Sequence, residues 1–311
     1  MSALTLEVDS SEAKLEVGAA LNDIVDKPGA TVVVLSAAGS SCTRQASSAQ
    51  DFTKQGTTHT GKFVYAVVAD GHGSKGRNHT INYLKDVDWD TLIDSRDFMQ
   101  GIISDIDLLN TTRSGSTLSV VRMSTDYIEC YFIGDSTIQI YENSVIAYKS
   151  KNHDRYNKKE IERISNYGNL RGIKADGVWD IVVTGDNDIK SVPGLRFDFG
   201  EGCDINMTHA LGHSGKTGNH FQYDKLIIDK SKPYKIVVAS DGLWDMFHVG
   251  DDSIIGSPYT DAEYLVEKAN KRWRQEWTHD NTQEKNKGTR FPEDNIDDIC
   301  ASTINYAPLP T

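Results

Sequence analysis

Three apolar segments of this sequence each lead into an aspartate, and this recurring pattern is the strongest chemical signal in the chain. The tetrapeptide Asp70–Gly73 (Asp-Gly-His-Gly) directly follows the apolar run 63–69, which predicts a buried strand. Asp135 and Asp241 follow apolar runs in a similar way. A single Asp-Gly after a strand is most often a turn, but three such strand ends together indicate one acidic site. Clustered carboxylates repel one another, and a bound divalent cation is the usual remedy.

The candidate metal ligands are aspartates from six positions. They are Asp51, Asp70, Asp135, Asp241, Asp245 and Asp294. Carboxylate oxygens suit hard cations such as Mg²⁺ and Mn²⁺, and two such ions about 3.5–4 Å apart can activate a shared water for attack on a phosphoryl group. Gly71 would allow close approach of the backbone, with its carbonyl as a further ligand. His72 is placed to protonate a leaving alkoxide, because the unperturbed pKa of histidine lies near neutrality.

The composition is that of a globular protein with an acidic balance. The 311 residues are 38% hydrophobic and 25% charged, and the formal net charge is −12. This charge argues against binding to nucleic acid or to an anionic membrane surface, and no apolar stretch approaches the length of a membrane span. The segment 1–20 lacks the apolar core of a secretory signal. We therefore expect an intracellular protein, cytoplasmic or nuclear, and we expect it to be a monomer.

Other kinds of catalytic site fit the sequence less well. The four cysteines, at positions 42, 130, 203 and 300, show no Cys-x-x-Cys pairing, so we expect reduced thiols and no zinc site. No cysteine precedes a phosphate-binding loop that ends in arginine, which disfavours a cysteine-dependent phosphatase. The segment 210–217 resembles a nucleotide-binding loop only loosely, because alanine stands at the first glycine position and no helix is predicted after it.

The elements that must position these residues are mostly strands. The predicted strands are 31–35, 62–69, 116–123, 127–133, 137–141 and 145–148. Short polar gaps between the later strands predict hairpins and therefore an antiparallel meander. Amphipathic spacing predicts helices over 95–110 and 158–167, and a third that begins at Thr260, where Thr260 and Glu263 would form a capping box. The apolar stripe of that third helix is Ala262, Val266, Ala269, Trp273 and Trp277.

Eight short motifs occur in the order in which they occur in a known family. They are Ala49–Phe52, Val68–Gly73, Ser114–Thr117, Gly134–Ser136, the set His153, Glu160, Arg163 and Ile164, then Thr208–Gly212, Ser240–Asp245 and Asp294–Ile296. With these motifs the chain resembles the metal-dependent serine/threonine protein phosphatases of type 2C, the PPM family. Each motif is weak alone, but their common order is highly specific.

The resemblance implies an α+β fold, a four-layer α-β-β-α sandwich in which two packed antiparallel sheets are flanked by helices. It implies a single catalytic domain over residues 1–311, in which the irregular region 166–223 would be a flap beside the active site. It also implies hydrolysis of phosphoserine and phosphothreonine in phosphorylated protein substrates. The nucleophile would be a hydroxide that bridges two Mn²⁺ or Mg²⁺ ions.

The resemblance also assigns roles to individual residues. Asp70 would bridge both ions, and His72 would be the general acid. The remaining ligands of the two ions would be Asp51, Gly71 (through its carbonyl), Asp241 and Asp294. The positions of Asp135 and Asp245 correspond to a weaker, third metal site.

Several positions depart from the family pattern. The family has a phosphate-binding arginine shortly before the early aspartate, and the nearest arginine here is Arg44, two positions further away than expected. His209 and His213 stand where arginine and aspartate are usual, and Asp297 replaces a usual threonine. The displaced Arg44 motivates an alternative function, a catalytically weak family member that binds phosphoproteins as a regulator. The complete set of proposed ligands favours an active enzyme.

Overall fold

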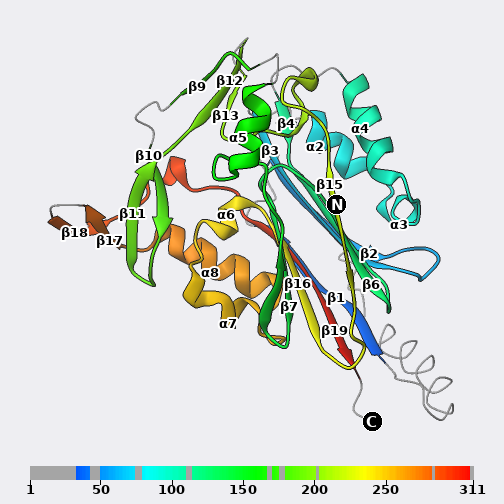
Figure 1. Ribbon diagram of the computed structural model, residues 1–311. Helices are drawn as coiled ribbons and strands as arrows, with labels where there is room; N and C mark the ends of the chain where they lie inside the picture. The colour runs from blue at the N-terminus through cyan, green and yellow to red at the C-terminus, as the bar shows by residue number, and fades with distance from the viewer. Residues whose placement is uncertain are drawn as a thin grey trace, which may run out of the picture.

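The computed structural model describes residues 33–42, 50–73, 79–109, 114–166, 170–174, 179–200, 203–281 and 284–308. Two antiparallel sheets form its centre (Figure 1). The first sheet has the strand order β1-β19-β16-β7-β8. Its strands are Val33–Cys42 (β1), Cys300–Pro308 (β19), Tyr234–Ala239 (β16), Thr137–Glu142 (β7) and Val145–Lys149 (β8).

The second sheet has the order β14-β4-β3-β5-β6-β15, and β2 pairs with β3 as well. Its strands are Leu211–Gly212 (β14), Ser114–Ser116 (β4), Val64–Gly73 (β3), Leu118–Met123 (β5), Tyr127–Ile133 (β6), Gln222–Ile227 (β15) and Asp51–Thr57 (β2). The single strand predicted over 116–123 is interrupted at Thr117, which lies between β4 and β5. This interruption occurs beside Asp70.

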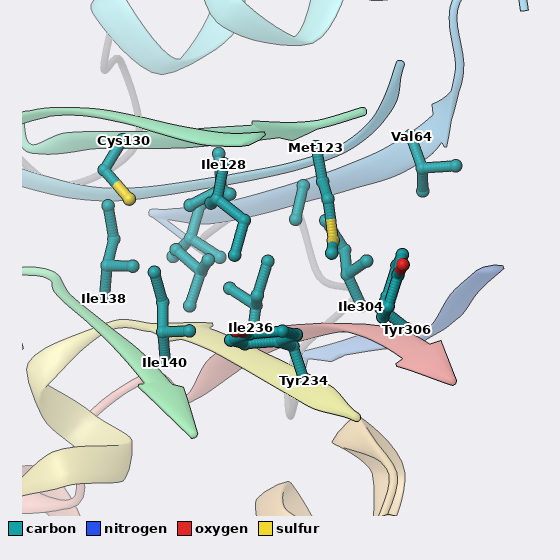
Figure 2. Packing of buried hydrophobic residues seen from close by; sticks show 14 of the residues in the cluster. Val64, Met123, Ile128, Cys130, Ile138, Ile140, Tyr234, Ile236, Ile304 and Tyr306 are labelled. Carbon is teal, nitrogen blue, oxygen red and sulfur yellow. The ribbon is translucent and has the colours of Figure 1, made fainter. Parts of the chain in front are cut away.

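The main hydrophobic core lies between the two sheets (Figure 2). Val64, Ala66 and Val68 of β3 point into this core, while Tyr65 and Val67 point into a second core on the opposite face of the same strand. Successive side chains of a strand point to opposite faces, so a strand covered on both sides reads as a continuous apolar run. This explains why the run 63–69 has no polar alternation.

Helices cover the outer face of each sheet and complete four layers. The second sheet is covered by His79–Asp86 (α2), Trp89–Leu92 (α3) and Phe98–Leu108 (α4). The first sheet is covered by Asp241–Trp244 (α6), Asp252–Ile255 (α7) and Ala262–Arg274 (α8). The predicted four-layer α-β-β-α sandwich is therefore confirmed. No helix among the described residues is long and apolar enough to cross a membrane.

The region 166–223, expected to be irregular, contains short strands instead. Three of them form a small sheet, Gly172–Lys174 (β9), Arg196–Gly200 (β12) and Cys203–Ile205 (β13). A second small sheet joins Trp179–Val183 (β10) and Asp188–Pro193 (β11) to Trp277–Asn281 (β17) and Glu284–Thr289 (β18). The remaining helical segments are Lys158–Ser165 (α5) and the 3₁₀ turns His213–Gly215 (η1), Val249–Asp251 (η2) and Glu293–Asn295 (η3). The nucleotide-binding interpretation of 210–217 fails, because the 3₁₀ turn η1 lies within this segment and the element that follows it is the strand β15.

Two details of the predicted third helix are wrong. Its N-cap is Asp261, whose carboxylate accepts the backbone N–H of Tyr264 at 2.8 Å, and not Thr260. The Thr260 hydroxyl instead donates to the carbonyl oxygen of Ile254 at 2.8 Å. Trp277 lies beyond the helix, at the start of β17, because α8 ends at Arg274. The other members of the predicted apolar stripe are buried as expected.

The expectation of four reduced thiols is wrong for one pair of cysteines. Cys42 and Cys300 lie directly opposite each other in β1 and β19, with their Cα atoms 4.3 Å apart, and form a disulfide. Cys130 and Cys203 are free and buried. The pair is separated by 258 residues, so only the pairing of the first and last strands of the sheet brings the two thiols together.

Candidate metal centre and active site

The first two candidate ligands meet because two neighbouring strands pair in register. Asp51 lies directly opposite Asp70 in the antiparallel pair β2–β3, so both side chains stand on the same face of the sheet. The backbone of Asp70 is fixed by Thr117, whose hydroxyl accepts the Asp70 N–H at 2.9 Å. The backbone N–H of Thr117 donates to the Asp70 carbonyl, also at 2.9 Å. Asp70 therefore lies within β3, which continues past the predicted end at residue 69, and the break between β4 and β5 fixes its backbone.

The first sheet delivers further aspartates to the same place. Ala239 at the end of β16 is paired with Thr137 at the start of β7, since these strands are antiparallel. Asp241, two residues after Ala239, and Asp135, two residues before Thr137, therefore emerge side by side. The carboxyl groups of Asp70 and Asp241 lie within hydrogen-bonding reach of each other, which joins the two sheets at the site.

The electrostatics of the cluster are unfavourable without a cation. Burial, together with the charges of Asp51 and Asp241, raises the pKa of Asp70 well above its usual value. Burial also raises the pKa of Asp51, although a hydrogen bond from the Ser240 hydroxyl opposes the rise. Desolvation and mutual repulsion both disfavour the ionised carboxylates. The folded chain therefore maintains a set of acids whose charges destabilise one another.

The donor set fits a hard divalent cation. Asp51 Oδ2 and Asp241 Oδ1 are buried and have no hydrogen-bond partner within the described part of the chain. Leaving a buried carboxylate oxygen unpaired is costly, whereas coordination to a cation removes that cost. All the atoms concerned are oxygens, which are the ligands preferred by Mg²⁺ and Mn²⁺.

Two further acids lie at the cluster that were not among the candidate ligands. Asp297 is close enough for its charge to raise the pKa of both Asp51 and Asp70. Asp298 accepts the backbone N–H of Gln50 through Oδ2 at 3.1 Å, which connects the segment before β19 to the start of β2. In the sequence, both belong to a run of acids just before the last strand. The start of that strand pairs with the end of β16, which leads to Asp241.

Some predicted site residues are not placed by the structure. Arg44 lies outside the described residues. The backbone of Asp294 lies in η3, but its side chain is outside the described part of the structure. Gly71 is placed, and its N–H donates to the carbonyl oxygen of Gln50 at 3.0 Å. The roles predicted for these three residues therefore stay predictions.

Asp135 and Asp245, predicted for a third ion, line one small pocket of about 100 Å³ together with Asp241. Burial and then the charge of Asp241 raise the pKa of Asp135 well above its usual value. Asp135 Oδ1 is buried without a hydrogen-bond partner in the described structure. Arg155 lines the same pocket, so this part of the site differs from the main cluster in holding a basic side chain.

His72 lies in contact with a second histidine. The Nε2 atoms of His72 and His213 are 2.6 Å apart, and the rings are nearly parallel with an interplanar angle of 18°. Gly115, opposite His72 in the β3–β4 pair, leaves room for this arrangement, since a Cβ atom there would lie 2.4 Å from His213 Nε2. Burial, followed by the charge of His213, lowers the pKa of His72 to about 3, so both imidazoles cannot be protonated together.

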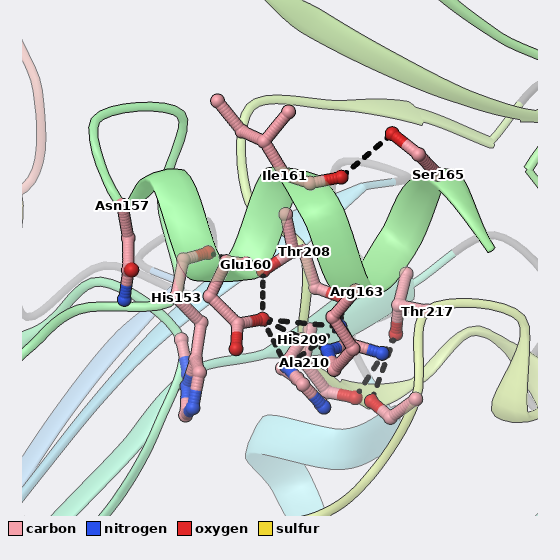
Figure 3. A network of polar contacts seen from close by, with 12 residues as sticks. His153, Asn157, Glu160, Ile161, Arg163, Ser165, Thr208, His209, Ala210 and Thr217 are labelled. Atoms are coloured by element: carbon pink, nitrogen blue, oxygen red, sulfur yellow. Dashed lines mark hydrogen bonds and ion pairs between the residues drawn. The ribbon is translucent and has the colours of Figure 1, made fainter. Parts of the chain in front are cut away.

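Figure 3 shows a polar network around Glu160 and His209. His153 Nδ1 accepts the backbone N–H of Gly134 at 3.1 Å. Nearby, Glu160 Oε2 lies 2.8 Å from the Thr208 hydroxyl, 3.0 Å from His209 Nδ1 and 3.1 Å from Arg163 Nε. Although burial acts in the opposite direction, hydrogen bonds from His209 and Thr208 lower the pKa of Glu160 to about 2. Arg163 already supplies the cation for Glu160, so this network serves to position backbone.

Comparison with known proteins identifies the fold. No protein-family model matches the sequence, and no curated protein sequence matches it. The structure resembles serine-threonine phosphatase 2C from Toxoplasma gondii with a TM-score of 0.55 and 12% identity, over 89% of this chain and 100% of that chain. It resembles the S. agalactiae serine/threonine phosphatase with a TM-score of 0.51 and 17% identity, over 88% of this chain and 99% of that chain.

A third similar structure is a C. elegans sex determining protein, with a TM-score of 0.52 and 14% identity, over 99% of this chain and 77% of that chain. The likenesses to the two phosphatases extend over nearly the full length of those chains. The strand order and the four layers of this structure agree with the fold that these comparisons indicate. This chain has the fold of the type 2C serine/threonine phosphatases.

Proposed function

We propose that this protein is a member of the type 2C family and hydrolyses phosphoserine and phosphothreonine in proteins, with Mn²⁺ or Mg²⁺ as its cofactor. The observation that carries the proposal is the convergence of Asp51, Asp70 and Asp241 from separate parts of the two sheets, with buried carboxylate oxygens on Asp51 and Asp241 that lack partners in the described structure. The fold supports the proposal, because the same layers occur in solved phosphatases.

The chain's own residues would hold two ions. Asp70 would contact both, since it lies between Asp51 on the neighbouring strand and Asp241 from the other sheet. Asp294 and the carbonyl oxygen of Gly71 are the further proposed ligands. When bound, the ions would activate a water molecule and offset the negative charge of the phosphoryl oxygens.

His72 is the proposed proton donor to the leaving serine or threonine oxygen. Its imidazole is neutral near pH 7 in this structure, because burial and His213 lower its pKa. A dianionic phosphoryl group beside the ring would favour the protonated imidazolium. Substrate binding would therefore charge His72 at the stage when a proton is required. Arg44 is the proposed contact for the substrate phosphate.

The test is hydrolysis of para-nitrophenyl phosphate and of a phosphothreonine peptide by the purified protein with Mn²⁺. We expect turnover that is lost on addition of a chelator and restored by excess Mn²⁺. Folded protein that binds the phosphopeptide but shows no metal-dependent turnover would instead support the regulatory alternative. Turnover that a chelator does not affect would contradict the metal assignment.

A further inference from the structure

The small pocket lined by Asp135, Asp241 and Asp245 is called the acidic pocket below. A large groove lies next to it. It has a volume of about 760 Å³. We call it the Trp244 groove, and its apolar walls are Ile146, Val182, Trp244, Phe247, Val249 and Ile255. Two of these side chains are exposed to solvent, Val249 by 87% and Ile146 by 37%. Single exposed apolar residues are common, but several that line one concave site mark a place where a ligand binds.

The groove and the acidic pocket share a wall. Trp244 lines both, and Asp241 and Asp245 of the acidic pocket are its close neighbours in the chain. The indole N–H of Trp244 lies 3.1 Å from the carbonyl oxygen of Ala239 and 3.2 Å from that of Thr137. These contacts tie the ring to the two strands that deliver Asp241 and Asp135. Trp244 therefore places the groove next to the strands that lead to Asp241 and Asp135.

Polar and charged side chains also line the groove, among them Lys149, His248 and Asp252. A concave surface with both apolar and polar groups suits a peptide, whose side chain contacts the apolar walls while its backbone amides contact the polar groups. Building on the proposed function, we propose that the Trp244 groove binds a bulky apolar side chain of the phosphoprotein substrate, near in sequence to the phosphorylated residue.

The test compares phosphothreonine peptides in which a single leucine or tryptophan is moved along an otherwise alanine-rich sequence. At the position that reaches the groove, we expect kcat/KM to exceed that of the alanine peptide by about tenfold or more, because a large apolar side chain leaves water. The Val249→Glu and Ile146→Glu variants should lose this preference while their turnover of para-nitrophenyl phosphate is unchanged. Leu108→Glu is the matched control, since Leu108 is 83% exposed on α4, outside the groove.

Several results would overturn the groove assignment. One is equal turnover of all the peptides by the wild-type protein, and another is an equal preference in Val249→Glu and Leu108→Glu. A dimer in sedimentation that Val249→Glu dissociates would make a second copy of the chain the occupant. Fluorescence anisotropy of labelled peptides separates this proposal from the proposed function. A groove-dependent binding preference without turnover would support the groove and contradict the phosphatase activity.

A separate observation concerns Arg155, the basic side chain of the acidic pocket. Arg155 is held in place by Asp180 of β10, with a distance of 2.5 Å between the guanidinium and Oδ2. Its side chain is only 14% exposed, and its Nε atom is buried without a hydrogen-bond partner in the described structure. Asp135 and Asp245 line the same pocket. Arg155 makes no ion pair with either carboxyl among the described residues, so its charge acts on them across the pocket that they share.

A permanent guanidinium charge in the pocket would repel a divalent ion bound there, because both are positive. We infer that the charge of Arg155 disfavours a third metal ion at Asp135 and Asp245 in this chain. The inference disagrees with the expectation of a third site from the family resemblance. It leaves the two-ion centre at Asp70 unchanged.

Counting Mn²⁺ ions by calorimetry and by electron paramagnetic resonance tests this inference without an activity assay. We expect two ions in the wild-type protein and an additional, weaker one in Arg155→Met. Arg155→Lys keeps the charge and should not gain the site. Asp180→Asn keeps the guanidinium and removes only its ion pair, so it should not gain the site either. A third ion in the wild-type protein with the affinity seen in Arg155→Met would overturn the inference, as would no gain in Arg155→Met. Loss of the two main ions in all four proteins would contradict the proposed function instead.

Discussion

The aspartate side chains of the acidic centre lie close enough together to repel one another when ionised. Asp70 is the clearest case, because Asp51 lies across the strand pair and Asp241 lies within hydrogen-bonding reach. Three aspartates at strand ends were predictable from the sequence, since each follows an apolar run. Asp297 and Asp298 were not predicted as part of the cluster, because the sequence could not show which acids before the last strand would point toward Asp51.

Asp70→Asn should abolish metal-dependent hydrolysis of para-nitrophenyl phosphate. An amide cannot bridge two cations as a carboxylate does, and we expect kcat/KM to fall by at least about a hundredfold. The fold should survive, since the backbone contacts of Asp70 with Thr117 do not use its carboxylate. Asp97→Asn, on the exposed surface, is the control and should keep full activity. Activity near that of the control would mean that Asp70 is not a metal ligand.

The raised pKa of Asp70 gives a pH dependence to the stability of the metal-free protein. An acid whose pKa is higher in the folded than in the unfolded state keeps its proton longer in the folded state, so its contribution to stability is lost as pH rises. In chelator, Asp70→Asn should therefore gain stability relative to the wild type as the pH rises above the ordinary pKa of an aspartate, about 4. Urea denaturation of both proteins at each pH measures this difference. A difference that does not change with pH, or that changes sign, would refute the assigned electrostatics.

The strands and turns explain why distant residues converge. β16 and β7 are antiparallel, and β19 is antiparallel to β16, so one end of the first sheet gathers Asp135, Asp241 and the segment before Cys300. The hairpins and the amphipathic helices were predictable from their periodicity. The N-cap of α8 and the position of Trp277 were not, because a capping box and a local apolar stripe are also compatible with neighbouring boundaries. Tertiary contacts decided between them.

Gly242 provides a test of this convergence. A Cβ atom at this position would lie 2.1 Å from the carbonyl oxygen of Asp298, so the backbone before β19 approaches the site only because residue 242 is glycine. Gly242→Ala should destabilise the protein by about 1–3 kcal/mol and weaken its binding of Mn²⁺. Thermal unfolding and Mn²⁺ titration measure the two effects.

Gly101→Ala is the control for that substitution. Nothing lies within 4 Å of a Cβ atom at Gly101, which is inside α4. Alanine should therefore stabilise the helix there, by about 0.5–1 kcal/mol. If Gly242→Ala also stabilised the protein, the close approach of the two segments would be disproved.

The whole molecule combines a predictable architecture with one covalent link that was not foreseen. Its two sheets and two helical layers follow from the apolar runs and hairpin turns and from the family resemblance. The small sheets of the region 166–223 were not predictable, since their strands are short and lack a clear alternation. The disulfide between Cys42 and Cys300 depends on the pairing of the first and last strands of the sheet, which no local pattern in the sequence reveals.

The disulfide should contribute to the stability of the whole chain. It closes a loop with a sequence separation of 258, and cross-links of long loops restrict the unfolded chain strongly. Replacing both Cys42 and Cys300 by serine should lower the free energy of unfolding by about 2–5 kcal/mol. Dithiothreitol should lower the stability of the wild type but not of the double variant. Equal stability of the two proteins under oxidising conditions would show that the link is absent or ineffective.

The central claim is that aspartates from both sheets build one centre for two divalent ions. Anomalous scattering at the manganese edge, from crystals grown or soaked with Mn²⁺, tests it most directly. We predict two peaks about 3.5–4 Å apart, both in contact with the carboxylate of Asp70, with Asp51 and Asp241 as further ligands. A crystal with no peak at Asp70, or with manganese bound only at other places on the molecule, would contradict the claim.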